Sequence, residues 1–206
     1  MYQMVHVLCT TWYIQMRHEI KSNRNASLQR CLVAYVRAGT MDLSLDQLAN
    51  SVGISKRMLI HYFGSRESLE EQAMTLLEDR LRDQFAPQNF PAGVSLESVL
   101  QALWDRSTNP SSKGVLLLVM DLSRRAWNGS ARAKAFYEKQ QYLWEELLLH
   151  YLPDPVAVRD ILQSFQGAVL RYLITGDPEP GRRMMSRLCT KRQKARKSRT
   201  KARATR

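Results

Sequence analysis

The side chains best suited to chemistry lie between residues 55 and 66, where hydroxyl, ammonium, guanidinium and imidazole groups follow one another closely. Arg57 and His61 are four residues apart, a spacing that places both on one face of a helix. A guanidinium facing outward can donate two hydrogen bonds to the O6 and N7 atoms of guanine. Ser55 and Lys56 lie where free backbone amides at a helix amino end favour a phosphate. The stretch therefore predicts hydrogen bonding to a nucleic acid.

Two short helices and a tight turn would hold these donors in place. Ser44 and Gln47 have the spacing of a capping box, which predicts that a helix begins at residue 45. The apolar residues of this helix recur on one face: Leu45, Leu48, Ala49 and Val52. Gly53 is suited to end it, and Ser55 is suited to cap the next helix. A turn this short between two helices indicates a helix-turn-helix arrangement.

The second helix is predicted to have an inner and an outer face. Leu59 and Phe63 would pack inward, while Arg57 would read a base and Lys56 and Arg66 would hold phosphates. The predicted contact set is Ser44, Ser55, Lys56, Arg57, Met58, Ile60, His61, Tyr62 and Arg66. The alternative interpretation is an ordinary helical hairpin with solvated side chains, because such patterns also arise by chance.

The flanking sequence carries a family resemblance. A helix predicted from Leu28 to Ala38 ends before Gly39, and Gly64-Ser65-Arg66-Glu67 introduces a long helix that runs to about Phe85. This order, with its Val-Gly-Ile-Ser turn and its Tyr-Phe-Gly-Ser-Arg-Glu segment, resembles the TetR family of bacterial transcriptional regulators over about Leu28 to Leu77. The resemblance implies an all-α chain with an amino-terminal three-helix helix-turn-helix domain followed by a helical effector-binding and dimerisation domain.

The resemblance also implies a function. Members bind a palindromic operator as homodimers and are released by a small effector, with repression the commoner outcome. The family usually has a Gly, a small hydroxyl residue and a Tyr where this chain has Arg57, Met58 and Ile60, so its operator sequence cannot be taken from relatives.

Charge is distributed unevenly along the 206 residues. Residues 1–66 hold 8 Lys and Arg against 3 Asp and Glu, and residues 67–181 hold 11 against 16. Residues 182–206 hold 12 Lys and Arg and no acidic residue, so they account for the whole net charge of +12. A basic amino-terminal part followed by an acidic part is the distribution expected of a DNA-binding protein whose second half avoids DNA.

Four segments follow from these patterns: an extension over residues 1–25, the helix-turn-helix domain over 26–70, the effector and dimerisation domain over 71–190, and a basic tail over 191–206. The tail is expected to be disordered, and it is expected either to bind phosphates without sequence preference or to be no more than a solvated terminal extension. A non-specific architectural nucleic-acid-binding protein driven by this tail is the alternative function. Arg17, Lys21 and Arg24 are predicted to form a short basic arm along DNA.

The second half of the chain is predicted to be helical, with sites for an effector and a partner subunit. Aromatic and Met side chains suited to an apolar effector pocket are Trp104, Met120, Trp127, Tyr137 and Trp144, and the few polar groups among them are Asp121, Arg124, Gln140 and Gln141. The resemblance implies a dimer interface on the last two helices, to which we assign Phe165, Ala168, Val169 and Tyr172. Both sets could instead be ordinary core, with the second facing the subunit's own interior.

Other classes of function find little support in the sequence. The chain has no glycine-rich phosphate loop, nucleophile elbow or metal-ligand spacing, so we expect neither catalysis nor a metal or other cofactor. Its uncharged first 16 residues are too short to span a bilayer, and no membrane association is expected. The three cysteines are scattered singly, as in a reduced cytoplasmic protein.

Overall fold

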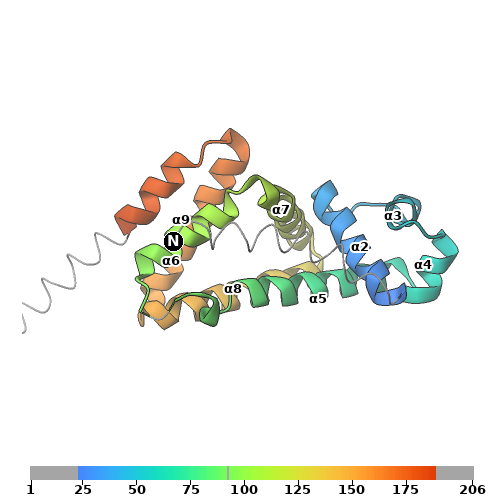
Figure 1. The fold of residues 1–206 in the computed structure, drawn as a ribbon, viewed down its shortest axis with the longest axis horizontal. Helices are drawn as coiled ribbons and strands as arrows, with labels where there is room; N and C mark the ends of the chain where they lie inside the picture. The colour runs from blue at the N-terminus through green and yellow to red at the C-terminus, as the bar shows by residue number, and fades with distance from the viewer. Residues whose placement is uncertain (1–22, 92, 189–206) are drawn as a thin grey trace, which may run out of the picture. The chain divides into compact units, whose positions relative to one another are not determined.

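The chain is helical throughout the part that the structure describes. The structure is a computed structural model, and it describes residues 23–91 and 93–188. The helices are α2 (Asn23–Ala38), α3 (Leu45–Val52), α4 (Lys56–Phe63), α5 (Arg66–Gln84), α6 (Leu96–Ser107), α7 (Lys113–Trp127), α8 (Ala131–Tyr151), α9 (Pro155–Thr175) and a last helix over residues 179–188 (Figure 1). Short 3-10 turns lie at Pro87–Asn89 and Pro110–Ser112. No strand occurs in these ranges, and the predicted all-α fold class is confirmed.

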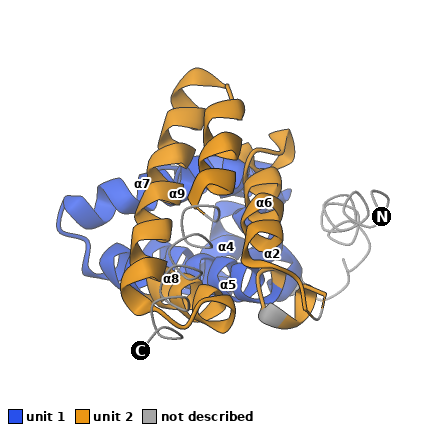
Figure 2. Cartoon of the chain, turned by 90° about the vertical axis from the view of Figure 1, so that its left-hand side faces the viewer, with its two compact units in different colours: residues 1–83, 114–138 blue, residues 84–113, 139–206 orange. Residues whose placement is uncertain are grey.

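The helices form two compact units, coloured separately in Figure 2. Unit 1 contains the described residues up to 83 together with residues 114–138, and unit 2 contains residues 84–113 and those from 139 onward. α8 passes through the division at residue 138, so it contributes to both units. The domain boundaries that we expected at residues 25, 70 and 190 divide the chain by function, and they stay a prediction.

Unit 1 is built on one apolar core. Its buried side chains come from every helix of the unit, and they include Leu32, Tyr35, Leu48, Leu59, Leu69, Leu77, Leu118, Leu122 and Phe136. Cys31 lies inside this core, where burial raises the pKa of its thiol to about 12. The other cysteines, the predicted basic tail and most of the amino-terminal extension lie outside the described residues.

Unit 2 buries apolar residues from α6, the second part of α8, α9 and the last helix. Its largest buried side chain is Trp104, whose ring packs edge-on against Phe165 and Tyr172. The indole Nε1–H of Trp104 donates to the carbonyl oxygen of Pro178 at 3.1 Å. The segment that leads into the last helix therefore supplies the hydrogen-bond acceptor that the buried indole of Trp104 needs.

Local signals explain most helix ends. α8 begins at Ala131, where the Ser130 hydroxyl accepts from the Ala133 amide at 3.3 Å. α9 ends at Gly176, and Pro180 and Gly181 both lie inside the last helix. Proline is tolerated there because the first turn of a helix has no carbonyl partner for its missing N–H.

None of the described helices is both long and apolar enough to cross a bilayer.

Candidate nucleic-acid interface

The corner between α3 and α4 has the capping geometry that its sequence predicts. The Ser44 amide donates to Gln47 Oε1 at 2.8 Å, and the Gln47 amide donates to Ser44 Oγ at 3.2 Å. Gly53 follows α3 with a left-handed φ of 76°, and its amide donates to Ala49. The Ser55 hydroxyl then accepts from the Met58 amide at 3.1 Å. Both helix starts are therefore fixed by side chains next to them in sequence.

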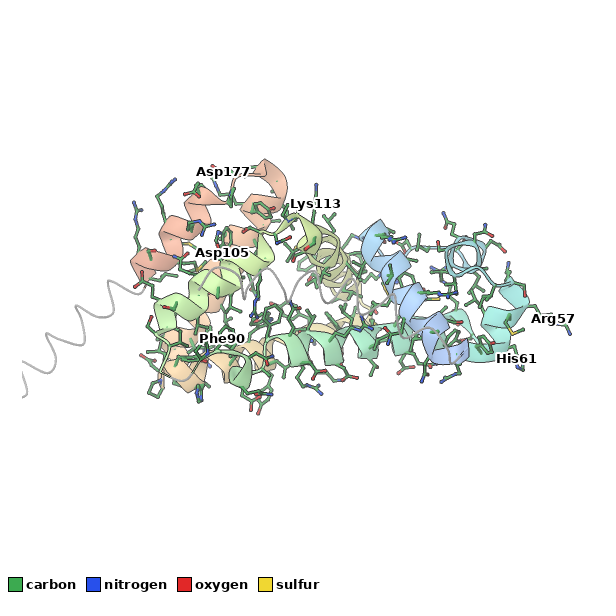
Figure 3. All side chains as sticks on the ribbon, viewed as in Figure 1. Arg57, His61, Phe90, Asp105, Lys113 and Asp177 are labelled. Carbon is green, nitrogen blue, oxygen red and sulfur yellow. The ribbon has the colours of Figure 1, made fainter. Side chains whose placement is uncertain are left out.

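The inner face of α4 packs against the core of unit 1. Leu59 and Phe63 are 1% and 4% exposed, and they pack with Leu48 and Val52 of α3. Because an α-helix turns about 100° per residue, Arg57 and His61 must then lie on the side away from this core. Figure 3 shows both side chains extending outward from α4. The predicted reading face is therefore free to meet a partner.

The charged groups near α4 differ in what they contact. Arg57 is exposed and makes no hydrogen bond or ion pair with any residue that the structure describes. Lys56, by contrast, lies 3.1 Å from Asp46 in an ion pair whose two side chains are more than half exposed. Exposed pairs of this kind contribute little to stability, so a phosphate could replace the carboxylate of Asp46.

Arg66, which we expected to hold a phosphate, is engaged elsewhere. Its Nε donates to Glu70 at 2.8 Å, and its Nη2 donates to the carbonyl oxygen of Met41 at 3.4 Å. The hydrogen bond to Glu70 raises the pKa of Arg66. A phosphate at this position would have to displace a half-buried carboxylate, so we leave Arg66 out of the proposed DNA contacts.

Two arginines of α2 hold the carboxyl ends of α3 and α4, a role that sequence reasoning missed. Arg24 Nε donates to the carbonyl oxygen of Tyr62 at 2.9 Å, and its Nη2 donates to Gln72 of α5 at 2.6 Å. Arg30 Nη1 donates to the carbonyl oxygen of Val52 at 2.9 Å. The last carbonyls of a helix have no partner within it, and a cation there also complements the helix dipole. Arg24 therefore fixes α4 in place, where we had expected it to lie along DNA.

The loop before α3 is fixed by Asp121 of α7. One carboxylate oxygen of Asp121 accepts from the Thr40 hydroxyl and from the Met41 amide, each at 3.0 Å. Arg124 and Arg125 of the same helix donate to Asp121 at 2.7 Å and 3.2 Å. Burial alone would raise the pKa of Asp121, but these hydrogen bonds and the charge of Arg125 outweigh it and hold the pKa below its usual range.

Arg124 and Arg125 also form ion pairs with acidic residues outside α7. Asp42, in the loop before α3, lies 3.0 Å from Arg124 Nη2 and 2.6 Å from Arg125 Nη2. Arg125 also lies 3.4 Å from Glu70 of α5. α7 is thus joined by charged groups to the loop that begins the helix-turn-helix and to the helix that follows it. A further arginine, Arg132 of α8, donates to the carbonyl oxygen of Glu67 at 2.8 Å.

The residues predicted to bind an effector fall into both units. In unit 2, Trp104 is fully buried, and Trp144 is half-buried with its ring 4.6 Å from that of Phe85. In unit 1, Met120 is half-buried, while Trp127 and Tyr137 are 91% and 41% exposed. Trp127 therefore lies on the surface of its unit.

The residues predicted to form a dimer interface lie mostly inside unit 2. Ala168 and Val169 are 9% and 5% exposed, and the rings of Phe165 and Tyr172 contact Trp104. The hydroxyl of Tyr172 also donates to the carbonyl oxygen of Thr108 at 2.9 Å. This arrangement favours the alternative in which the stripe faces the subunit's own core.

Comparison with known proteins relates this fold to solved structures. No protein-family model matches the sequence, and no curated protein matches it either. The structure is similar to a TetR-family transcriptional regulator from Streptomyces coelicolor, with a TM-score of 0.65 and 20% identity over 81% of this chain and 78% of that one. A TetR transcription regulator from Haloarcula marismortui gives a TM-score of 0.62 and 18% identity over 80% of this chain and 96% of that one. The described part of the chain therefore has the fold of TetR-family regulators.

Proposed function

We propose that this chain is a sequence-specific DNA-binding regulator of transcription, acting in the cytoplasm as a homodimer on a palindromic operator. The observation that carries the proposal is the outward position of Arg57 and His61 on a helix whose two ends are both fixed. In a helix-turn-helix protein the second helix enters the major groove, and its amino-terminal residues contact base edges. α4 would take this role, with α3 crossing the DNA backbone.

Contacts to the DNA backbone would come from the amino ends of α3 and α4. Ser44 and Ser55 lie at these ends, and Lys56 can exchange Asp46 for a phosphate. Phosphate contacts of this kind set the position of a protein on DNA without reading its sequence. Sequence preference would then depend on the outer face of α4.

The proposed partner subunit would pack on the exposed side of α9, beside the stripe that we first assigned. Val156, Leu170 and Ile174 are 63%, 50% and 76% exposed, and Gly167 is also exposed. Gly167, Leu170 and Ile174 follow at intervals of three and four residues, so they share one face of the helix. No described neighbour lies within 4 Å of the position that a Cβ on Gly167 would take, which leaves room for the partner's helix.

A small effector, mainly apolar in character, is part of the same proposal. In unit 2, Gln140 is 7% exposed, and its Nε2 has no hydrogen-bond acceptor among the described residues. Gln140 and Trp144 are one turn apart on α8, and Trp144 packs against Phe85. An effector with an apolar body and one carbonyl or carboxylate oxygen would satisfy the buried amide. Compounds that raise the Tm of the chain but not that of Gln140→Leu would identify this site.

The central test is selection of random duplexes on the purified full chain, on the Arg57→Ala variant, and on a form that ends at Thr190. A sequence-reading dimer would enrich one palindromic motif in the full chain and in the shortened form, and the motif would persist at raised salt. Arg57→Ala would weaken or change it, whereas Lys139→Ala, which removes a cation from unit 2, would leave it unchanged.

Two outcomes would reject the proposal. Enrichment of no motif by the full chain would exclude a sequence-specific regulator. Binding that loses affinity equally for all duplexes with salt, and disappears with the tail, would indicate the alternative, a non-specific architectural protein.

The dimer is tested separately by light scattering coupled to gel filtration. A carboxylate at the centre of an apolar interface is strongly unfavourable, so Leu170→Glu and Ile174→Glu should convert a dimer to a monomer. Tyr142→Glu introduces the same charge at an exposed position of α8 and should leave the dimer intact. Dimers that survive both α9 substitutions would place the interface elsewhere.

A further inference from the structure

The outer face of α4 combines cationic and apolar side chains. Going round the helix at about 100° per residue, Arg57 and His61 occupy the centre of this face, with Ile60 beside Arg57 and Met58 beside His61. Met58 and Ile60 are 39% and 37% exposed, although both are large apolar residues. A purely phosphate-binding helix would not need apolar groups beside its cations.

Packing among the residues that the structure describes does not account for these two apolar side chains. Leu59 and Phe63 already fill the inner face of α4, at 1% and 4% exposed. The Met58 amide donates to the Ser55 cap, so the backbone position of Met58 is fixed while its side chain stays accessible. In the major groove, the apolar group that a side chain can contact is the C5-methyl group of thymine.

The guanidinium of Arg57, at the centre of this face, is suited to bind the edge of a base. Arg57 has no partner among the residues that the structure describes, whereas Lys56, Arg66 and Arg24 each contact a neighbouring side chain. An unpaired guanidinium keeps both prongs available for the O6 and N7 acceptors of guanine. A lysine at this place would supply charge but not the paired geometry.

We propose that α4 reads a guanine together with thymines in neighbouring base pairs. Arg57 donates to O6 and N7 of the guanine, and Met58 and Ile60 contact thymine methyl groups on the two sides of it. His61, one turn after Arg57, adds a donor to the same strip of bases. This inference rests on the proposed function, and it specifies which chemical groups of the operator that function recognises.

The test uses operator duplexes altered by single atoms or methyl groups, bound to the full chain and measured by fluorescence anisotropy. In the half-site recovered by selection, 7-deazaguanine removes only N7, and deoxyuridine in place of thymidine removes only the methyl group. We expect 7-deazaguanine at one position to weaken binding about tenfold. Deoxyuridine at a neighbouring position should weaken it about fourfold, the value of one buried methyl group.

Protein variants assign each loss to a side chain. In Arg57→Ala the penalty for 7-deazaguanine should vanish, and Arg57→Lys should recover only part of the affinity. In Met58→Ala or Ile60→Ala the penalty for deoxyuridine should vanish at one position each. Tyr142→Ala, which shortens an exposed aromatic residue of unit 2, should keep every penalty.

The possible results separate this inference from the proposed function. If selection recovers an operator but no altered duplex binds more weakly, the inference is wrong and the regulator proposal stands. If Arg57→Ala weakens all duplexes by one common factor and keeps every penalty, Arg57 holds a phosphate and the inference is again wrong. If no operator is recovered, the proposed function fails first and the inference fails with it.

Discussion

Each unit brings two helices together at a glycine, but the two glycines meet different neighbours. In unit 1, a Cβ added to Gly114 of α7 would overlap the backbone carbonyl of Val36 in α2. In unit 2, a Cβ added to Gly181 of the last helix would overlap the indole ring of Trp104 in α6. The first contact is with backbone, and the second is with a side chain.

This difference determines how each contact can respond to change. A helix backbone can retreat only if the whole helix moves and loses its packing, whereas a side chain can be exchanged for a smaller one. The fixed contact occurs on α2, the helix whose Arg24 and Arg30 hold the ends of α4 and α3. The adjustable contact occurs in the unit that carries the exposed face of α9. Unit 1 therefore has the more rigid support, as the proposed role of α4 in reading bases requires.

The largest effect should follow from Gly114→Ala. The new methyl group meets the carbonyl of Val36, so α7 must move away from α2 and loosen the apolar core between them. We expect the free energy of unfolding to fall by about 3 kcal/mol, measured by urea denaturation of the full chain.

Gly167→Ala is the matched control for this substitution, and both are made in the Leu170→Glu background, in which the partner helix proposed to pack on Gly167 is absent. Gly167 lies in the middle of α9, and its added Cβ would have no described neighbour within 4 Å. Alanine should therefore stabilise that helix by up to about 1 kcal/mol. Equal losses in the two variants would show that the contact with Val36 has no special importance.

A smaller loss should follow from Gly181→Ala, and it should be reversible. The clash is with the Trp104 ring, so about 2 kcal/mol of stability should be lost in the natural background. In a Trp104→Phe background the smaller ring leaves room, and Gly181→Ala should then cost less than about 1 kcal/mol. Additive losses in this double-mutant cycle would contradict a side-chain contact and would remove the contrast with unit 1.

The sequence predicted the helix-turn-helix corner because its signals are local. Ser44, Gln47, Gly53 and Ser55 each act on a backbone group within four residues, and all four are observed in the predicted roles. The exposed position of Arg57 also followed from helical spacing alone. In such a segment, the types and spacing of the residues are enough to predict where the helices begin and end and which side chains face outward.

Contacts between distant residues could not be predicted in this way. Arg24 donates to Tyr62, 38 residues away, and nothing near Arg24 in the sequence indicates that partner. α9 has apolar residues on nearly all sides, so periodicity could not tell which side faces the subunit's own core. Phe165 and Val169 had the expected spacing for an interface, yet the structure leaves Leu170 and Ile174 exposed instead.

Substitution of one aspartate in each unit, Asp121 in unit 1 and Asp105 in unit 2, tests the comparison of the two units further. Asp121 of unit 1 is 8% exposed and accepts from Thr40 and Met41, whereas Asp105 of unit 2 is 46% exposed and pairs with Arg182 at 2.6 Å. Asp121→Ala leaves buried donors without acceptors and should cost about 2 kcal/mol. Asp105→Ala breaks only an exposed pair and should cost less than about 1 kcal/mol. Similar losses in urea denaturation would contradict this account.

The smallest effect should be the dependence of the Asp121 contribution on pH. The hydrogen bonds to the carboxylate hold the pKa of Asp121 below its unfolded value of about 4, so the ionised form is favoured in the folded chain. Its contribution is therefore complete above about pH 4 and is lost as the pH falls through the lower folded pKa. The stability difference between the natural chain and Asp121→Asn should be constant near neutral pH and should shrink in acid. A difference that stays constant in acid would show that ionisation of Asp121 does not stabilise the loop before α3.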